Sequence, residues 1–194
     1  MNKENDKKVF DNRRTIEPFD INIHGRISTG LPCCENHEWK VFSKIHNDGF
    51  LTNSLSRKST GNQVMLDLFY AGYHKILTEL TDHGCRLRKV HMSGLGIGTM
   101  IPVIFSYKNV ETLNVVEISQ SLIDLIGPFY ESYISDGKLK IICADARRWL
   151  PEDEHYDLAF HDIWTSNKNK ERIEIMRAYQ DYAKKQVCWT RTWL

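Results

Sequence analysis

The sequence lacks a hydrophobic run long enough to cross a membrane. A membrane-spanning helix needs about 18 or more consecutive apolar residues, and none of the 194 residues lies in such a stretch. The polar N-terminus, MNKENDKKVFDNRR, also lacks the apolar segment of a secretory signal peptide. We therefore expect a cytoplasmic protein with no membrane partner.

The chain also lacks an excess of charge of either sign. Its 26 Lys and Arg residues face 25 Asp and Glu residues, which gives a formal net charge of +1. Tight nucleic-acid binding needs a basic surface that displaces counterions from the phosphates, so we expect a small-molecule partner instead. The 41% of apolar residues is typical of a globular domain.

Cysteine is scarce and irregularly spaced. Five cysteines are an odd number without the spacing of a disulfide framework, so we expect free thiols in a reducing compartment. Cys33, Cys34 and His37 carry atoms that zinc prefers, but their spacing matches none of the usual zinc motifs. We predict a loop after Pro32 and no metal site.

The patterns along the chain predict one main domain preceded by a small β region. Residues 1–18 carry too few apolar side chains to offset the entropy of ordering, so we expect a mobile tail. Residues 19–58 contain short alternating segments, 19–23 and 39–45, which are typical of strands and hairpins. Residues 59–194 are predicted to form the main domain.

The main domain alternates between helical and strand patterns. A first helix is predicted from Thr60 to Gly84, because Thr60 and Gln63 have the spacing of a capping box and Met65 begins a helical apolar repeat. Strands are predicted at 89–93, 112–117, 139–143, 156–162 and within 186–194, and further helices from about Thr99, Ser121 and Lys168. This alternation predicts an α/β, Rossmann-like, doubly wound and mostly parallel sheet with helices on both faces.

A glycine-rich turn lies between the first of these strands and the next helix. Gly94, Gly96 and Gly98 allow a tight turn and the close approach of a ligand to the backbone. N–H groups at the start of the helix beyond it are free to bind a ligand. The alternative is a turn that only serves the fold.

Acidic residues end the next three strands. Glu117 lies 19 residues after Gly98, where a carboxylate can accept hydrogen bonds from both hydroxyls of a ribose. Asp145 and Asp162 follow the third and fourth strands. Because ligands lie at the carboxyl ends of such sheets, we expect the four strand ends to face one crevice. The alternative for Glu117 is a solvated carboxylate at a strand end.

These residues resemble the class I S-adenosylmethionine-dependent methyltransferase superfamily, including its spermidine-synthase-like branch and small phage-type methyltransferase-like proteins. The resemblance covers about residues 60–165. It implies that S-adenosylmethionine is the cofactor, that its methionine part lies against the glycine turn, and that Glu117 binds the ribose. It further implies that Asp145 and Ala146 contact the adenine, with Ile118 packed on the adenine face. A nicotinamide enzyme is an alternative, but its pattern needs a glycine where Thr99 stands.

Asp162 is the candidate catalytic residue, because it ends the fourth strand beside the expected position of the methyl group. We expect it to orient or deprotonate the acceptor, unless it only caps the next segment. By strand alternation, His161 should point into the opposite helix layer.

Two segments are similar to spermidine synthases, which transfer an aminopropyl group from decarboxylated S-adenosylmethionine. Residues 156–162 look like the strand that leads to that family's catalytic Asp, and residues 73–77 are similar to its Tyr-His-Glu-Met-Leu stretch. However, Thr165 replaces the family's second acid and Lys75 its Glu, and a polyamine cation needs acids. We therefore predict methyl transfer, with aminopropyl transfer as the alternative.

A third interpretation is a protein that binds an adenosyl ligand without catalysis, or serves a structural role. It is motivated by the short C-terminal end of the sheet, where the family usually has an antiparallel pair of strands. The N-terminal region or a partner could complete that edge. Trp189 and Trp193 are candidates for a homodimer contact or for the core.

Overall fold

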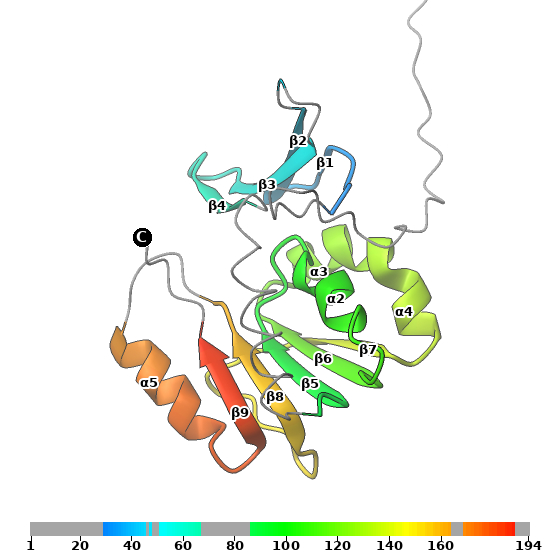
Figure 1. Cartoon of the computed structure of the whole chain (residues 1–194). Helices are drawn as coiled ribbons and strands as arrows, with labels where there is room; N and C mark the ends of the chain where they lie inside the picture. The colour runs from blue at the N-terminus through cyan, green and yellow to red at the C-terminus, as the bar shows by residue number, and fades with distance from the viewer. Residues whose placement is uncertain (1–28, 46, 48–50, 67–85, 164–168, 189–194) are drawn as a thin grey trace, which may run out of the picture.

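Two β-sheets organise the part of the chain that the computed structural model describes, which comprises residues 29–45, 47, 51–66, 86–163 and 169–188. The larger sheet has five strands and the smaller has four. The small sheet lies over the carboxyl ends of the strands of the large one (Figure 1).

The large sheet confirms the predicted Rossmann-like fold. Its strands pair in parallel in the order β7-β6-β5-β8-β9. They are β5 (Lys89–Ser93), β6 (Thr112–Glu117), β7 (Leu139–Cys143), β8 (Tyr156–His161) and β9 (Ala183–Cys188). The chain proceeds outward from β5 in one direction and then in the other, so the strand order reverses between β5 and β8. Sheets of this kind bind ligands beside such a reversal.

Most of the predicted strand bounds agree with the structure. Strands β5, β6 and β7 have the predicted bounds, and β8 ends one residue earlier than predicted. The last strand begins earlier than expected, at Ala183, and runs parallel to β8. Residues 189–194, with Trp189 and Trp193, lie outside the described residues.

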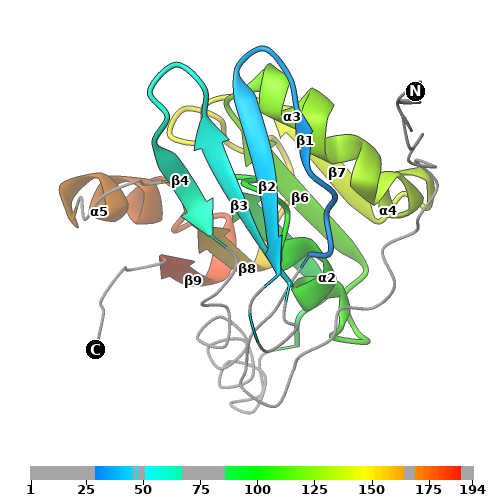
Figure 2. The same cartoon turned by 90° about the horizontal axis from the view of Figure 1, so that it is seen from above.

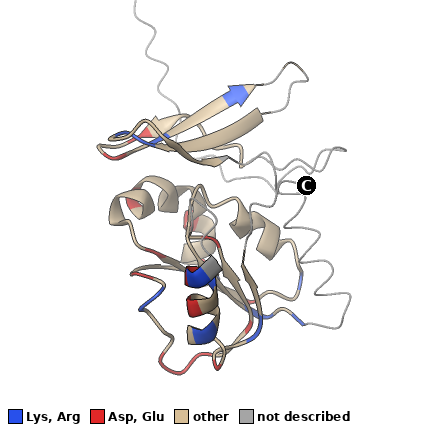
Figure 3. Ribbon diagram, turned by 90° about the vertical axis from the view of Figure 1, so that its left-hand side faces the viewer, with Lys and Arg blue, Asp and Glu red and all other residues tan. Residues whose placement is uncertain are grey.

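Helices cover both faces of the large sheet, as predicted. One face carries α2 (Met100–Phe105), α3 (Gln120–Ile126), the 3-10 turn η2 (Gly127–Tyr130) and α4 (Glu131–Ser135). The other carries α5 (Asn169–Ala178), which presents charged residues of both signs outward (Figure 3). The first face buries the main core, which includes Val90, Met92, Leu113, Val115, Leu158 and Phe160. None of the described helices is long and apolar enough to span a membrane.

The small sheet is antiparallel and has the order β1-β2-β3-β4. Its strands are β1 (Cys34–Glu35), β2 (Trp39–Ile45), β3 (Leu51–Arg57) and β4 (Gln63–Leu66). The predicted strand over 39–45 is therefore confirmed as β2. Residues 1–28, including the predicted tail and the strand over 19–23, lie outside the described residues.

The predicted helix from Thr60 is wrong over Gln63–Leu66, which form β4. The Thr60 hydroxyl accepts a hydrogen bond from the Asn62 N–H at 3.2 Å instead of capping a helix, and Gly61 turns the chain at φ 65°. Strand β4 then pairs with β3, so the small sheet includes residues that we assigned to the main domain. The rest of the predicted helix, residues 67–85, lies outside the described residues.

A chain of hydrogen bonds links two histidines on the α5 face of the sheet. The Gln186 amide donates to the Met176 carbonyl at 2.8 Å, which leaves its oxygen to accept from His161 Nε2 at 3.3 Å. His161 Nδ1 then accepts from the Ser93 hydroxyl at 2.8 Å, and Ser93 accepts from His91 Nε2 at 3.0 Å. In this network His161 donates from Nε2 and accepts at Nδ1, which is the bonding of a neutral ring, and it points toward the α5 layer as predicted.

Burial keeps both rings neutral. It lowers the pKa of His91 from 6.5 to about 3, with a further lowering by His161. It lowers the pKa of His161 from 6.5 to about 4, against the hydrogen bond with Gln186, which raises it. Both values lie below those of the unfolded chain, so the unfolded chain binds more protons as the pH falls below 6.5.

The protein should therefore lose stability between pH 6.5 and 5. We expect the free energy of unfolding to fall by about 1.4 kcal/mol per pH unit for each buried histidine, measured by urea denaturation at several pH values. His161→Gln should reduce this slope by about half, because one of two titrating rings is gone. The exposed His155 is the control, and His155→Gln should leave the slope unchanged. A wild-type slope near zero would contradict the prediction.

Candidate functional site

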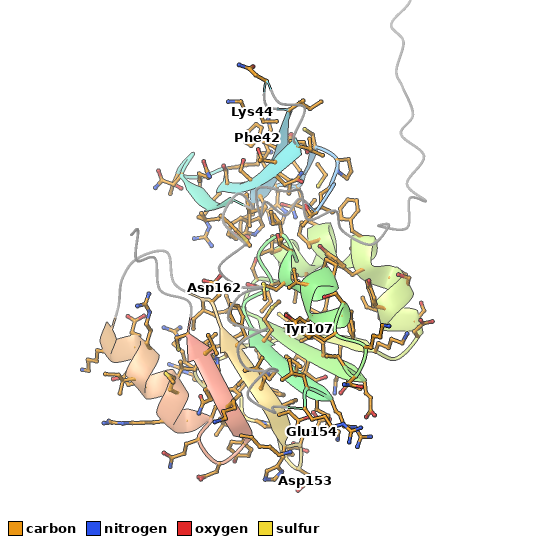
Figure 4. All side chains as sticks on the ribbon, viewed as in Figure 1. Phe42, Lys44, Tyr107, Asp153, Glu154 and Asp162 are labelled. Carbon is orange, nitrogen blue, oxygen red and sulfur yellow. The ribbon has the colours of Figure 1, made fainter. Side chains whose placement is uncertain are left out.

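Four parts of the chain lie at the carboxyl edge of the large sheet, beside the reversal of strand order. They are the glycine turn after β5, the turn from Glu117 into α3, the segment after β7, and Asp162 after β8. Figure 4 places Asp162 at this edge, toward the small sheet, and places Asp153 and Glu154 at the opposite edge. The structure thus brings the predicted site residues to neighbouring strand ends.

The three glycines of the turn are needed by the packing of the chain itself. Gly94, Gly96 and Gly98 have φ values of 94°, 54° and 73°, which side chains rarely adopt. A Cβ at Gly94 would collide with the carbonyl oxygen of Asp162, one at Gly96 with the Met65 thioether, and one at Gly98 with the Tyr130 ring. The glycine pattern therefore has a structural cause, and the case for a ligand depends on the residues around the turn.

Glu117 is a buried carboxylate that joins two of the turns. Glu117 is only 8% exposed, which excludes the alternative of a solvated carboxylate at a strand end. One oxygen accepts a hydrogen bond from the Leu95 N–H and the other from the Ser119 N–H, each at 2.9 Å. A carboxylate has about four acceptor positions, so Glu117 retains the capacity to accept from two hydroxyls.

The residue after Glu117 is apolar and open to solvent. Ile118 is 62% exposed, although it directly follows a buried strand. An exposed isoleucine beside a buried carboxylate is the arrangement that a ligand with a ribose and a flat apolar ring would use. The predicted contact of Ile118 with adenine stays a prediction.

Asp145 already has a strong partner. Its two oxygens accept from Arg147 Nε at 2.9 Å and from Arg147 Nη2 at 2.8 Å. These bonds are the main reason that the pKa of Asp145 is lowered from its ordinary value. The Ala146 side chain is buried with Val116 on the α5 face, so its methyl group is part of the core. Any contact of Ala146 with a ligand must therefore come from its backbone.

Asp162 is held in place by the strand beside it. Its backbone N–H donates to the Ser93 carbonyl at 2.9 Å, and its side chain is half-buried. Burial raises the pKa of the Cys188 thiol to about 11, against the charge of Arg172, which lowers it, and with a smaller contribution from the charge of Asp162, which raises it. Within the described ranges, no cluster of three or more His, Cys, Asp or Glu residues has the geometry to hold a metal.

No protein-family model matches the sequence, and no curated protein matches it. A spermidine synthase from Thermotoga maritima is 15% identical, with a TM-score of 0.55 over 88% of this chain and 63% of that one. The chain has the spermidine synthase fold.

Two other solved structures are also similar to this chain. A spermidine synthase in complex with the transition state analogue AdoDATO is 16% identical, with a TM-score of 0.54 over 79% of this chain and 52% of that one. An S-adenosylmethionine-dependent methyltransferase from Clostridium acetobutylicum ATCC 824 is 15% identical, with a TM-score of 0.47 over 61% of this chain and 48% of that one. The chain thus spans about half to two thirds of the length of these proteins.

In this spermidine synthase fold, the small sheet contributes contacts that the sequence did not indicate. Figure 2 shows the small sheet lying over β6 and close to α3. Met65 Sδ accepts a hydrogen bond from the Ile97 N–H of the glycine turn at 3.3 Å. Trp39 Nε1 donates to the hydroxyls of Ser119 at 3.0 Å and Ser121 at 3.1 Å. Sequence reasoning placed Met65 in a helix and had no signal that would connect Trp39 to this turn.

The glycine turn allows a test of its packing. Gly98 and Gly137 have similar φ values, 73° and 71°. The Cβ that Gly98→Ala adds would collide with the Tyr130 ring, whereas the Cβ that Gly137→Ala adds would meet no atom within 4 Å. The shared φ should cost about 1 to 2 kcal/mol, and the collision at Gly98 a further ~1 to 3 kcal/mol, in urea unfolding. Equal losses in the two variants would show that the Tyr130 ring gives way.

Proposed function

We propose that the protein is an S-adenosylmethionine-dependent methyltransferase that acts on a small-molecule acceptor. The observation that carries the proposal is the buried carboxylate of Glu117, which bonds to the glycine turn on one side and is followed by the exposed Ile118 on the other. The spermidine synthase fold supports this proposal, because it places these residues at the carboxyl edge of a parallel sheet.

The residues at this edge suit an adenosyl group. Glu117 retains acceptor capacity for two ribose hydroxyls, and each such charge-assisted bond contributes about 1.5 to 3 kcal/mol. Ile118 offers an apolar surface to the adenine ring. Asp145 would have to loosen its contact with Arg147, or use an acceptor position that Arg147 leaves open, in order to contact the adenine amino group.

Asp162 is the proposed catalytic residue. When bound, S-adenosylmethionine supplies an activated methyl group together with its own leaving group. The protein then has mainly to align the acceptor, and alignment can contribute about 7 to 11 kcal/mol to lowering the barrier. Asp162 lies at the strand end beside the glycine turn, where a carboxylate can orient the acceptor or accept its proton.

Aminopropyl transfer is the second candidate. Two similar solved structures with TM-scores above 0.5 are spermidine synthases. Against it stand Thr165 and Lys75, which replace two acids of that family's pattern. A site that lacks these acids attracts a polyamine less. Binding without catalysis is the third candidate. A ligand titration separates methyl transfer from aminopropyl transfer, and a transfer assay with methyl-labelled cofactor separates catalysis from binding alone.

Titration calorimetry with four ligands tests the proposal. We expect micromolar binding of S-adenosylmethionine and S-adenosylhomocysteine, and at least tenfold weaker binding of decarboxylated S-adenosylmethionine and NAD. Preference for the decarboxylated form would favour aminopropyl transfer. Absence of binding to every ligand would contradict an adenosyl site.

The same titration with Glu117→Ala tests the ribose contact. Affinity for S-adenosylhomocysteine should fall at least tenfold, because the charge-assisted bonds to the ribose are lost. Some stability should be lost too, since the Leu95 and Ser119 N–H groups lose their acceptor. Glu111→Ala is the control, because Glu111 is exposed at the other end of β6. Unchanged affinity of Glu117→Ala would remove the ribose assignment.

Asp162→Asn tests the catalytic role. We expect S-adenosylmethionine affinity within about twofold of wild type and at least a ~100-fold loss of transfer, which is the range of a lost general base. Transfer is measured with methyl-labelled cofactor and an acceptor found by screening small molecules. Asp153→Asn, at the opposite edge of the sheet, is the control. A variant with the full rate would reduce Asp162 to a structural cap.

A further inference from the structure

We infer that Trp39 of the small sheet is a positioning residue for Glu117, and that it acts through Ser119. The inference rests on the proposed function, because it assigns Trp39 to the ribose site. Three observations support the inference: the hydrogen bond from Trp39 to Ser119, the hydrogen bond from Ser119 to Glu117, and the packing that fixes the Trp39 ring.

The first link is the hydrogen bond between the small sheet and the start of α3. Trp39 is 7% exposed and its Nε1–H donates to the Ser119 hydroxyl at 3.0 Å, across the junction between β2 and the start of α3. The same Ser119 oxygen caps α3 by accepting from the Leu122 N–H at 3.3 Å. Ser119 therefore joins the indole of the small sheet to the helix that follows the ribose carboxylate.

The direction of the bonds around Ser119 is fixed by a carboxylate. The Ser121 hydroxyl donates to Glu38, a short contact that is the main cause of the lowered pKa of Glu38. Ser121 therefore has no proton for Ser119, and the Ser119 hydroxyl donates to Ser121 across 3.0 Å. The Ser119 oxygen is left as an acceptor, and indole N–H is a donor only. The Trp39 indole N–H therefore donates to an oxygen that is free to accept.

The second link is the backbone of Ser119. Its N–H donates to one oxygen of Glu117 at 2.9 Å, while the Leu95 N–H of the glycine turn holds the other oxygen. The orientation of the carboxylate therefore depends on where the Ser119 backbone lies. A shift of Ser119 would rotate the carboxylate away from a ribose without touching the ligand.

The third link is the packing of the Trp39 ring. The Arg57 guanidinium covers it at 4.9 Å from the ring centroid, and Arg57 also bonds to Glu38 at 3.0 Å. Asn36 binds both sides of the junction: its side-chain oxygen accepts from the Trp39 N–H at 2.8 Å, and its amide donates to the Ser121 carbonyl at 2.6 Å. The indole is thus fixed at its backbone and over its ring.

A pair of ligands tests the inference. S-adenosylhomocysteine and its 2′,3′-dideoxy analogue differ only in the hydroxyls that Glu117 would bind. Trp39→Phe keeps an aromatic side chain, although a smaller one, and removes the indole N–H. It should weaken S-adenosylhomocysteine about threefold to tenfold, the range of one lost hydrogen bond, and weaken the dideoxy analogue less than twofold. Ser119→Ala, which leaves Trp39 in the core, should give the same selective loss. It also covers the case in which Trp39→Phe does not fold.

The control and the opposing outcomes separate this inference from the proposed function. Tyr133→Phe also removes a polar group from an aromatic ring, in α4, and should change neither affinity. Equal weakening of both ligands by Trp39→Phe and by Ser119→Ala, or no weakening of either, would overturn the inference while the proposed function stands. If wild type binds neither ligand, the proposed function fails, and the inference fails with it.

Discussion

The candidate site depends on the hydrogen bonds that the Glu117 carboxylate makes with two backbone N–H groups. These bonds connect the glycine turn after β5 to the turn that enters α3. Charge-assisted bonds of this kind are shorter and stronger than neutral ones, and their burial makes an unpaired carboxylate costly. The two turns therefore hold a common geometry before any ligand arrives. A ligand would meet acceptor positions that are already oriented, so little affinity is lost in ordering the protein.

The small sheet is part of this arrangement. It reaches the glycine turn through Met65 and the start of α3 through Trp39. Its outer side, with Phe42 and Lys44, points away from the large sheet (Figure 4). One face of the small sheet is thus buried against the rest of the protein and the other faces solvent, as is common for antiparallel sheets.

The sequence predicted those parts of the molecule whose signals are local. Strands β5 and β6 carry apolar residues at alternate positions, such as Val90 and Met92, and their carboxyl ends are marked by Gly94 and by Glu117, so their bounds and Glu117 could be predicted. Strand β4 was missed for two reasons. Thr60 and Gln63 have the spacing of a capping box, and the strand, Gln63–Leu66, is too short to show the alternation of apolar and polar residues that is typical of a strand. The contacts of Trp39 and Met65 bridge 80 and 32 residues of chain. Contacts of that range depend on how the two sheets pack, which no local pattern encodes.

The parallel order of the large sheet sets when the site can form. Strand β5 lies between β6 and β8, and its register places Ser93 beside His161, 68 residues further along the chain. Pairings between distant segments form slowly, because a long loop must close first. During synthesis the glycine turn and Glu117 emerge well before β8, so they are present in the nascent chain before Asp162. A chain that ends before Tyr156 would leave one side of β5 without its parallel neighbour, so the edge of the sheet beside the reversal of strand order is complete only after β8 has been translated.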